Sequence, residues 1–213
     1  MAQKALNIIF LGPPTSGKGT QAEMLAKKIG LVSISTGNIF RENIQKKTKL
    51  GKIAASFIDK GKLVPDDITN QLIAKTLKKI KRGFILDGYP RNLSQAKALE
   101  KIVKIDSVFY IKISDKEAIQ RIVGRRVCPA CGRVYHIKVM RPKKKGICDV
   151  CGSKLIHRED DRKEVIKKRL KIYHRDTEPV VGFYRKKGLL IEINGEQSIK
   201  EVYQDIVGKL NRC

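Results

Sequence analysis

Short apolar runs alternate with segments of helical periodicity along most of the chain. Runs typical of buried strands occupy residues 6–11, 31–34, 83–87, 107–113 and 189–193. The first helical segment, which lies between the first two of these runs, repeats apolar residues at Ala22, Leu25, Ala26 and Ile29. That spacing gives a helix one apolar face, and the glycine that follows can end the helix in the left-handed conformation. Since strands that alternate with helices build a parallel sheet covered on both faces, we predict an α/β fold with five parallel strands and right-handed connections.

Other helices are placed by their start signals. Pro65 presets the backbone angle of a first helical turn, and Asp66 and Asp67 complement the helix dipole, so a helix should begin there. Ser94 is expected to cap a helix that runs to about residue 104, and the last helix should follow Ser198. The segment between the second and third strands is therefore predicted to be mostly helical.

A glycine-rich loop joins the first strand to the first helix. Residues 12–20 read GPPTSGKGT and match G-x-x-x-x-G-K. Such a loop points several backbone N–H groups and a helix N-terminus at a phosphate chain, and Lys18 adds a cation. Gly19 stands where Ser or Thr is usual, so a hydroxyl directed at Mg²⁺ must come from Thr20, as in a nucleotide-kinase subset of these loops. A glycine-rich turn with an exposed lysine is the alternative, which the flanking strand and helix disfavour.

An acidic residue ends the third predicted strand. Asp87 closes the run of residues 83–87, where a carboxylate at the carboxyl end of a parallel strand can hold Mg²⁺ or its waters. The next residues, 88–91, read GYPR and turn the chain so that Arg91 is presented at the same edge. The sequence thus predicts a phosphate site with a cation and a metal-directed acid.

The cysteines form a metal-binding pattern. Two CxxC pairs, each followed by glycine and separated by the sixteen residues 132–147, supply Cys128, Cys131, Cys148 and Cys151. Each unit can turn back and offer two thiolates to one tetrahedral ion, and the spacing is typical of structural zinc. Because four thiolates close the coordination sphere, a catalytic zinc is not expected; unligated thiols are the alternative. Cys213 is interpreted as a spare thiol, and the usage as a whole indicates a reducing cytoplasm.

The net charge of the chain indicates which kind of partner it binds. The 213 residues include 46 Lys and Arg against 21 Asp and Glu, a formal net charge of +25. An anionic partner is expected, although a lysine-rich surface explains most of the excess. The sequence contains no apolar run long enough for a membrane span and no signal peptide, so we expect no membrane partner.

Arginines rather than a general base are expected to carry the chemistry. Arg121 and Arg125, four apart in a helix expected at about residues 116–126, should share one face. Planar guanidinium groups can clamp phosphate oxygens and neutralise charge that shifts during phosphoryl transfer. The candidates for this role are Arg41, Arg91, Arg125, Arg158 and Arg169. Arg126 is interpreted as a surface side chain.

The histidines are assigned no catalytic role. None shows a paired carboxylate spacing; His136 and His157 are expected in the second insertion, and His174 is interpreted as structural. A phosphate acceptor already carries its nucleophilic oxygen at neutral pH, because its second pKa is about 6.

Taken together, these motifs resemble the adenylate kinase family over nearly the whole chain. The matching stretches, besides the phosphate loop, are Ser35-Thr36-Gly37 with Arg41, residues 62–64, residues 86–91 with Gln95, residues 121–126, residues 132–136, residues 158–161 and Arg169. The resemblance implies a P-loop CORE made of residues 1–34, 65–123 and 162–213, an AMP-binding insertion at 35–64 and a zinc-bearing LID at 124–161. It also implies transfer of a phosphoryl group between ATP and AMP, giving two ADP, with Mg²⁺ and closure of the LID.

The resemblance also assigns residues. Those implied for ATP are Thr15, Ser16, Gly17, Lys18, Gly19, Thr20, Arg121, Arg125, Val134, Tyr135 and Gln197. Those implied for AMP are Thr36, Arg41, Lys62, Leu63, Val64, Gly88, Tyr89, Pro90, Arg91, Gln95, Arg158 and Arg169. Those implied for the transfer itself are Lys18, Asp87, Arg91, Arg125, Arg158 and Arg169. The Gln95 amide offers a donor and an acceptor to adenine, and the acids of residues 160–161 are expected beside closing arginines or in a helix cap.

Three positions depart from the family pattern. Thr15 stands where glycine is common, which predicts a strained or altered loop. Tyr89 replaces a more frequent Phe, and Asn38 stands where an acid is usual, which makes that edge of the AMP site more positive.

Two other functions stay open at this point. A UMP/CMP kinase would use the same chemistry, although such enzymes usually lack a long LID. A zinc-ribbon nucleic-acid binder that uses ATP as a switch would explain the charge, but residues 143–145, three lysines, have no interleaved aromatic residues. We therefore expect a monomeric, cytoplasmic nucleotide kinase that binds ATP, AMP and ADP and no nucleic acid.

Overall fold

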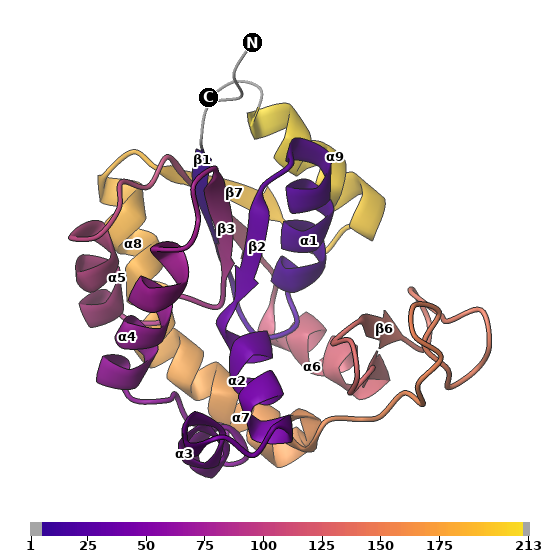
Figure 1. Cartoon of the computed structure of the whole chain (residues 1–213). Coiled ribbons are helices and arrows are strands. Elements are labelled where there is room, and N and C mark those ends of the chain that lie inside the picture. Colours follow the sequence, from indigo (N-terminus) through magenta and orange to yellow (C-terminus); the bar gives the residue numbers. More distant parts are fainter. Residues whose placement is uncertain (1–5, 211–213) are drawn as a thin grey trace.

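Five parallel strands form the central sheet (Figure 1). The computed structural model describes residues 6–210, leaving out the side chains of residues 159 and 163. The strands are β1 (Leu6–Leu11), β2 (Val32–Ser35), β3 (Gly83–Asp87), β4 (Ser107–Lys112) and β7 (Leu190–Asn194), in the spatial order β2-β3-β1-β4-β7. All four neighbouring pairs are parallel. The predicted α/β class and five-stranded parallel sheet are confirmed, with strand ends shifted by a residue at β2, β4 and β7.

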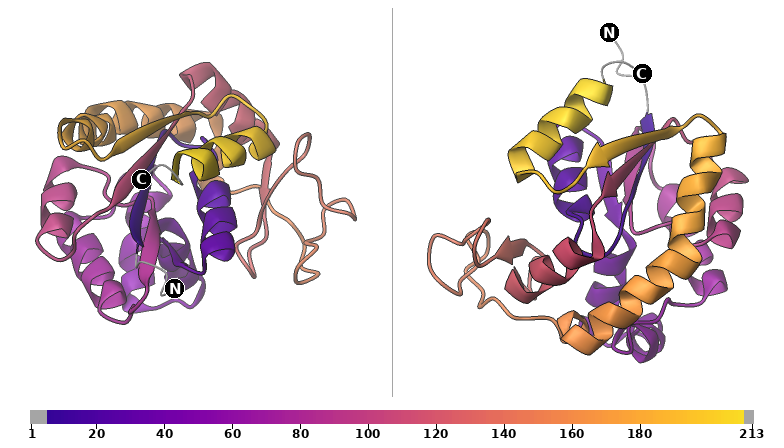
Figure 2. Two further views of the ribbon diagram at one scale, coloured as in Figure 1. Left: turned by 90° about the horizontal axis from the view of Figure 1, so that it is seen from above. Right: turned by 180° about the vertical axis from the view of Figure 1, so that it is seen from behind.

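Helices cover both faces of this sheet, as the view from above shows (Figure 2). In β1, Ile8 and Phe10 point to one face and pack against α1 (Lys18–Ile29) and α9 (Ile199–Leu210). Ile9 and Leu11 point to the other, toward α4 (Asp66–Leu77), α5 (Leu93–Glu100) and α8 (Glu178–Lys186). Alternate residues of a buried strand serve both cores, which explains why β1 reads as a continuous apolar run.

The helical segment after β2 is confirmed as two short helices and the start of a third. The two are α2 (Thr36–Gln45) and α3 (Lys49–Ile58), and Gly51 lets them approach so closely that a Cβ there would lie 2.0 Å from the carbonyl oxygen of Asn43. Gly61, at φ +66°, ends the segment against α7 (Lys163–Ile172), where a Cβ would lie 2.9 Å from Cγ1 of Val165 and 3.3 Å from Cγ of Arg169.

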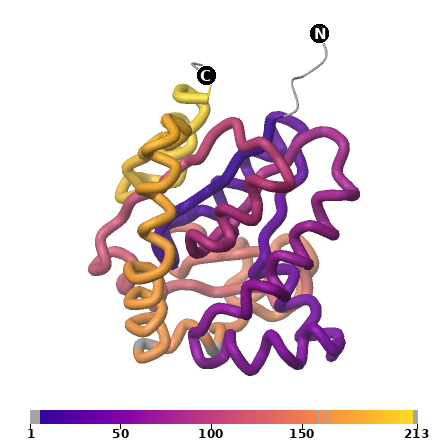
Figure 3. The backbone as a smooth tube through the Cα atoms, turned by 90° about the vertical axis from the view of Figure 1, so that its left-hand side faces the viewer, coloured from indigo at the N-terminus to yellow at the C-terminus, as the bar shows by residue number. Residues whose placement is uncertain are grey.

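One long helical rod returns the chain from the second insertion to β7. It consists of α7, a π-helical turn (Tyr173–Thr177) and α8, and it runs along one side of the molecule in Figures 2 and 3. The π-helical turn lies between the two α-helices and places His174 beside Glu178 and Asp115. Its ring nitrogens lie 2.9 Å from a carboxylate oxygen of Glu178 and 3.0 Å from one of Asp115. The prediction that no histidine has a paired carboxylate is therefore wrong, because Glu178 stands four residues further on.

Two helix ends differ from the predictions. Helix α5 is capped by Asn92, whose Oδ1 accepts from the backbone N–H of Gln95 at 2.8 Å, and ends at Glu100 instead of about residue 104. Helix α6 (Asp115–Gly124) ends before Arg125, whose backbone is extended at φ −68° and ψ 136°. Glycine at 124 accommodates the ring of His136, which a Cβ would meet at 2.2 Å.

The second insertion begins at that point. Arg125 opens strand β5 (Arg125–Val127), which pairs with β6 (Val134–His136) in an antiparallel ribbon. Arg121 and Arg125 therefore do not share a helix face, contrary to the prediction. Within residues 6–210, no helix has the length and apolar character needed to cross a membrane. Cys213 lies outside the described residues.

Candidate active site

A cavity of about 1600 Å³ opens at the carboxyl ends of the central strands. It lies where the connections from β1 and β3 leave the sheet, the position at which α/β sheets hold ligands. Every residue predicted for nucleotide binding or phosphoryl transfer lines this cavity except Tyr89. The Tyr89 side chain is fully buried in the core instead, with its hydroxyl donating to Oδ1 of Asn70 at 2.7 Å.

The phosphate loop surrounds the ammonium group of Lys18. Its Nζ donates to the carbonyl oxygens of Gly12 and Pro13, at 2.8 Å each. Burial lowers the pKa of Lys18 from 10.5 to about 8, opposed by the nearby charge of Asp87. Gly12 is needed because a Cβ there would lie 2.4 Å from the carbonyl oxygen of Ile111. The loop thus holds a cation at the start of α1, where the helix N-terminus also favours an anion.

Thr15 confirms the strain predicted for the loop. Its backbone adopts φ +62°, the left-handed region that a β-branched residue seldom occupies. The hydroxyl lies 2.6 Å from the carbonyl oxygen of Pro14 and 2.8 Å from that of Ala118 in α6. A side chain that strains the loop therefore also ties it to the helix that leads into the second insertion.

Asp87 faces the start of α1. Its Oδ2 accepts from the hydroxyl of Ser35 at 3.1 Å and would lie 3.2 Å from a Cβ on Gly19. A glycine after the lysine thus lets the carboxylate approach the loop. Ser35 was not among the predicted site residues, although its place beside Thr36 at the end of a strand is a signal that could have found it.

Partly buried arginines line the same cavity as the phosphate loop. Burial lowers the pKa of Arg158 to about 9 and of Arg169 to about 10, and neighbouring guanidinium groups add to the effect. Arg91 is partly buried and donates from Nε to the carbonyl oxygen of Gly88 at 2.8 Å. Arg41 donates to Oδ1 of Asn38 at 2.7 Å. These side chains come from four separate segments of the sequence.

Two aspartates compensate part of this charge. Asp161 is ion-paired with Arg125, and Asp160 with Arg169 at 2.9 Å. Although burial alone would raise the pKa of Asp160, Arg169 and the other arginines lower it below its usual value. The sequence expectation that these acids lie beside arginines is confirmed. Nε of Arg158 is buried and has no hydrogen-bond partner among the described residues. A buried donor without a partner fits a site that receives phosphate oxygens.

Arg121 and Gln197, two residues predicted to contact ATP, each form hydrogen bonds within the protein. Arg121 donates to Glu117 at 2.6 Å and to the carbonyl oxygen of Gly195 at 2.7 Å. Gln197 is half-buried and donates from Nε2 to the carbonyl oxygen of Asn194 at 3.0 Å. Arg121 therefore connects α6 to the loop after β7.

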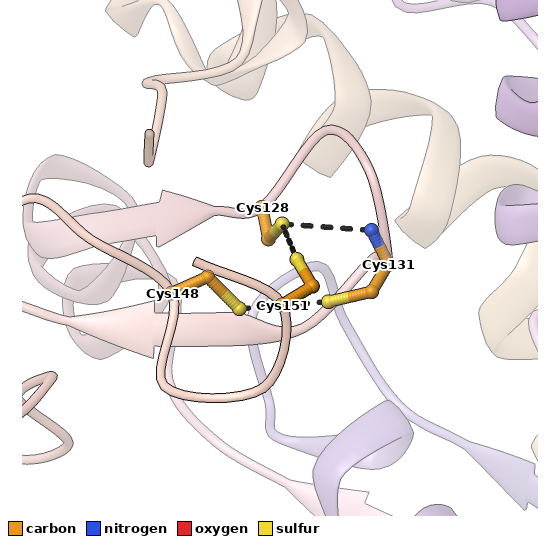
Figure 4. A group of neighbouring side chains, drawn as sticks. All are labelled: Cys128, Cys131, Cys148 and Cys151. Carbon is orange, nitrogen blue, oxygen red and sulfur yellow. Dashed lines mark hydrogen bonds between the residues drawn. The ribbon is translucent and has the colours of Figure 1, made fainter. Parts of the chain in front are cut away.

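The four cysteines lie together within the second insertion, beyond the end of the β5–β6 ribbon that is farther from α6 (Figure 4). Their Sγ atoms are all within 4.8 Å of one another, with Cys128 and Cys151 at 3.3 Å and Cys131 and Cys148 at 3.5 Å. A tetrahedral ion with metal–sulfur bonds of about 2.3 Å would separate its sulfurs by about 3.8 Å, so the cluster matches the size of a zinc site.

The two cysteine loops have the same backbone geometry. In each, the glycine after the second cysteine has a positive φ and donates to the carbonyl oxygen of the first cysteine, 3.0 Å away in both Gly132 and Gly152. Tyr135 packs beside them, with its hydroxyl 3.5 Å from Sγ of Cys148 and accepting from the backbone N–H of Asp149 at 2.8 Å. Its hydroxyl therefore serves the cysteine cluster, although the residue also lines the cavity.

Comparison with known proteins decides the family. A family model described as adenylate kinase matches residues 10–189. The chain belongs to the adenylate kinase family. An adenylate kinase of Caldanaerobacter subterraneus subsp. tengcongensis is 48% identical over 208 residues, 94% of each chain. Similar proteins of the same name occur in Caldicellulosiruptor saccharolyticus, 44% identical over 96% of this chain and 99% of the relative, and in Thermococcus kodakarensis, 45% identical over 94% and 92%. As an adenylate kinase, the chain is a phosphotransferase with a phosphate group as acceptor.

Proposed function

We propose that this chain transfers the terminal phosphoryl group of Mg²⁺-bound ATP to AMP and forms two ADP. The observation that carries the proposal is the cavity itself, which is lined by a phosphate loop and by partly buried arginines, one of them with an unpartnered buried donor. Two polyanions would otherwise repel, and such fixed cations offset that repulsion. Names of the related proteins agree with this reaction.

The two nucleotides are assigned to opposite sides of the cavity. The loop residues from Thr15 to Thr20 would hold ATP, together with Arg121, Arg125, Val134, Tyr135 and Gln197. Thr36, Arg41, residues 62–64, Gly88, Pro90 and Gln95 would hold AMP, with Arg91, Arg158 and Arg169 near the transferred group. Asp87, beside the start of α1, would orient the waters of Mg²⁺. This division corresponds to the proposed CORE, AMP-binding insertion and LID.

Transfer by this arrangement needs alignment and charge neutralisation more than proton abstraction. The phosphate of AMP carries a nucleophilic oxygen at neutral pH, since its second pKa is about 6. Lys18 and the arginines would stabilise charge on the moving phosphoryl group, and a closed cavity would exclude water that could otherwise accept it. Hydrolysis of ATP should therefore be slow relative to transfer.

A structural zinc ion is proposed for Cys128, Cys131, Cys148 and Cys151. Its donor set, four thiolates, suits zinc and fills the coordination sphere, so the ion would stabilise the LID and take no part in transfer. The expectations of a monomeric, cytoplasmic enzyme without a nucleic-acid partner stay predictions.

Formation of ADP from ATP plus AMP, followed by a coupled assay, tests the proposed reaction. The wild-type chain should form ADP, and Lys18→Ala should lose about 3 kcal/mol of transition-state stabilisation, a factor of about 10² or more in rate. AMP, CMP, UMP and GMP offered as acceptors test the UMP/CMP kinase alternative. A metal-replete chain that forms no ADP from ATP and AMP would contradict the proposal.

A further inference from the structure

Gln95, Asp66 and Asn92 form a network of hydrogen bonds at the starts of α4 and α5, beside the proposed AMP side of the cavity. Nε2 of Gln95 donates to Oδ1 of Asp66 at 2.7 Å, and its Oε1 accepts from the backbone N–H of Arg91 at 2.8 Å. Nδ2 of Asn92 lies 2.9 and 3.0 Å from the two oxygens of Asp66. Gln95 is 2% exposed and lines the cavity, whereas Asp66 does not line it.

These partners permit one orientation of the Gln95 amide. An ionised carboxylate only accepts hydrogen bonds and a backbone N–H only donates. If the amide rotated by half a turn, its oxygen would face Asp66 and its NH₂ group would face the N–H of Arg91. Both hydrogen bonds would be lost in a buried place, where unsatisfied polar groups are costly. The amide therefore keeps one N–H and one oxygen lone pair in a fixed order for a ligand.

That order distinguishes two kinds of purine. Adenine presents a donor, the 6-amino group, beside an acceptor at N1, whereas hypoxanthine and guanine present an acceptor, O6, beside a donor at N1. An amide held in one orientation can pair with the first edge but opposes the second. We propose that Asp66 is a positioning residue that selects adenine over 6-oxopurine acceptors by holding the Gln95 amide in one orientation. The inference rests on the proposed function, in which Gln95 contacts the base of AMP.

The surroundings of Asp66 suit this task. It lies in the first turn of α4, where the helix dipole favours a negative charge. Tyr89 supports the same region from the core, with its hydroxyl 3.2 Å from the carbonyl oxygen of Gln95. Asp67, the next residue of the same turn, is exposed and provides a matched control.

Acceptor selectivity tests the inference. The measurement is kcat and KM for AMP and for IMP, the hypoxanthine nucleotide, with Mg-ATP as donor. In Asp66→Ala the ratio of kcat/KM for AMP to that for IMP should fall about tenfold or more, mainly through a higher KM for AMP. Asp66→Asn, whose carbonyl can still accept from Gln95, should give an intermediate ratio. Asp67→Ala, which removes the same helix charge, should keep the wild-type ratio.

Gln95→Ala separates this inference from the proposed function. If Gln95→Ala lowers the ratio and both Asp66 variants leave it unchanged, Asp66 has no positioning role and the inference is overturned. If Gln95→Ala changes neither the ratio nor the KM for AMP, Gln95 does not read the base, which also overturns the inference while ADP formation continues. If Asp66→Ala proves unfolded by circular dichroism, the ratio in the folded Asp66→Asn chain decides.

Discussion

Nζ of Lys18 lies 2.8 Å from the carbonyl oxygen of Gly12, inside the loop that would hold a phosphate chain. The carbonyl stabilises the ammonium group only partly, because burial still lowers its pKa to about 8. A phosphate would supply the full negative charge that the carbonyl lacks. Binding of a nucleotide and protonation of this lysine should therefore be linked.

The linkage predicts that ATP binds more weakly as the pH rises above about 8. The free enzyme loses the Lys18 proton in that range, whereas the complex keeps it because phosphate raises the lysine pKa. Up to one proton must then be taken up on binding, so the dissociation constant should increase by at most about tenfold for each pH unit. Titration of a fluorescent ATP analogue between pH 7 and 10 measures this. A slope as steep in Lys18→Ala as in the wild type would assign the effect to another group.

Substitutions at Thr15 should separate strain from bonding. Thr15→Gly removes left-handed strain of about 1–2 kcal/mol and loses a hydrogen bond of about 1 kcal/mol, so the free energy of unfolding should change by less than about 1 kcal/mol. Thr15→Val keeps the strain and loses the bond, and should destabilise by about 1–2 kcal/mol. Urea unfolding of both variants checks this. Activity of Thr15→Gly should be unchanged or higher; a loss beyond about tenfold would show that the hydroxyl is needed.

The ion pair of Asp160 with Arg169 should make stability depend on acid pH. Because the folded-state pKa of Asp160 is lowered below 3.8, its contribution is present above that pH and is lost as the pH falls through the folded value. Asp160→Asn should lower the free energy of unfolding by about 1–3 kcal/mol at pH 7 and by less near pH 3. Asp176→Asn, in a pair whose arginine is exposed, should cost under about 1 kcal/mol. Equal losses for Asp160→Asn at both pH values would contradict the assignment.

Removal of the proposed zinc ion should unfold the second insertion, the proposed LID, before the sheet. The apolar cluster around the cysteines contains little more than Tyr135 and Leu155, too few side chains to hold the insertion without an ion. A chelator should therefore speed hydrogen exchange across residues 125–156 and leave β1 and β4 protected. Metal analysis should find one zinc per chain in the wild type and in Cys213→Ser, and much less in Cys148→Ser. Unchanged exchange after complete metal removal would show that packing suffices.

The sheet and the phosphate loop could be predicted because local patterns determine them. A strand buried on both faces reads as an apolar run, and the loop requires glycines around one lysine at fixed spacing. The four cysteines likewise needed only their spacing. Their proximity across sixteen residues is confirmed.

The errors arose where distant contacts decide the local backbone. Their spacing of four residues predicted that Arg121 and Arg125 share one helix face. The ring of His136, from β6, packs against Gly124, however, and the helix ends there. Tyr89 belongs to a motif that matches the adenylate kinase family, yet its side chain lies in the core. Its hydroxyl can be buried there because it donates to Asn70, nineteen residues earlier. The role of Asp66 was also hidden, since a helix start explains an acid at that place without reference to Gln95.

The contact of Gly61 with α7 connects the two sides of the cavity mechanically. Any side chain at residue 61 would meet Val165 and the aliphatic part of Arg169, and would push the rod that carries this guanidinium group. A larger residue at position 61 would thus displace the Arg169 guanidinium group and alter the charge around the phosphoryl group in transfer. A chimera that takes its AMP-binding insertion, residues 35–64 here, from a relative should accordingly keep glycine at position 61.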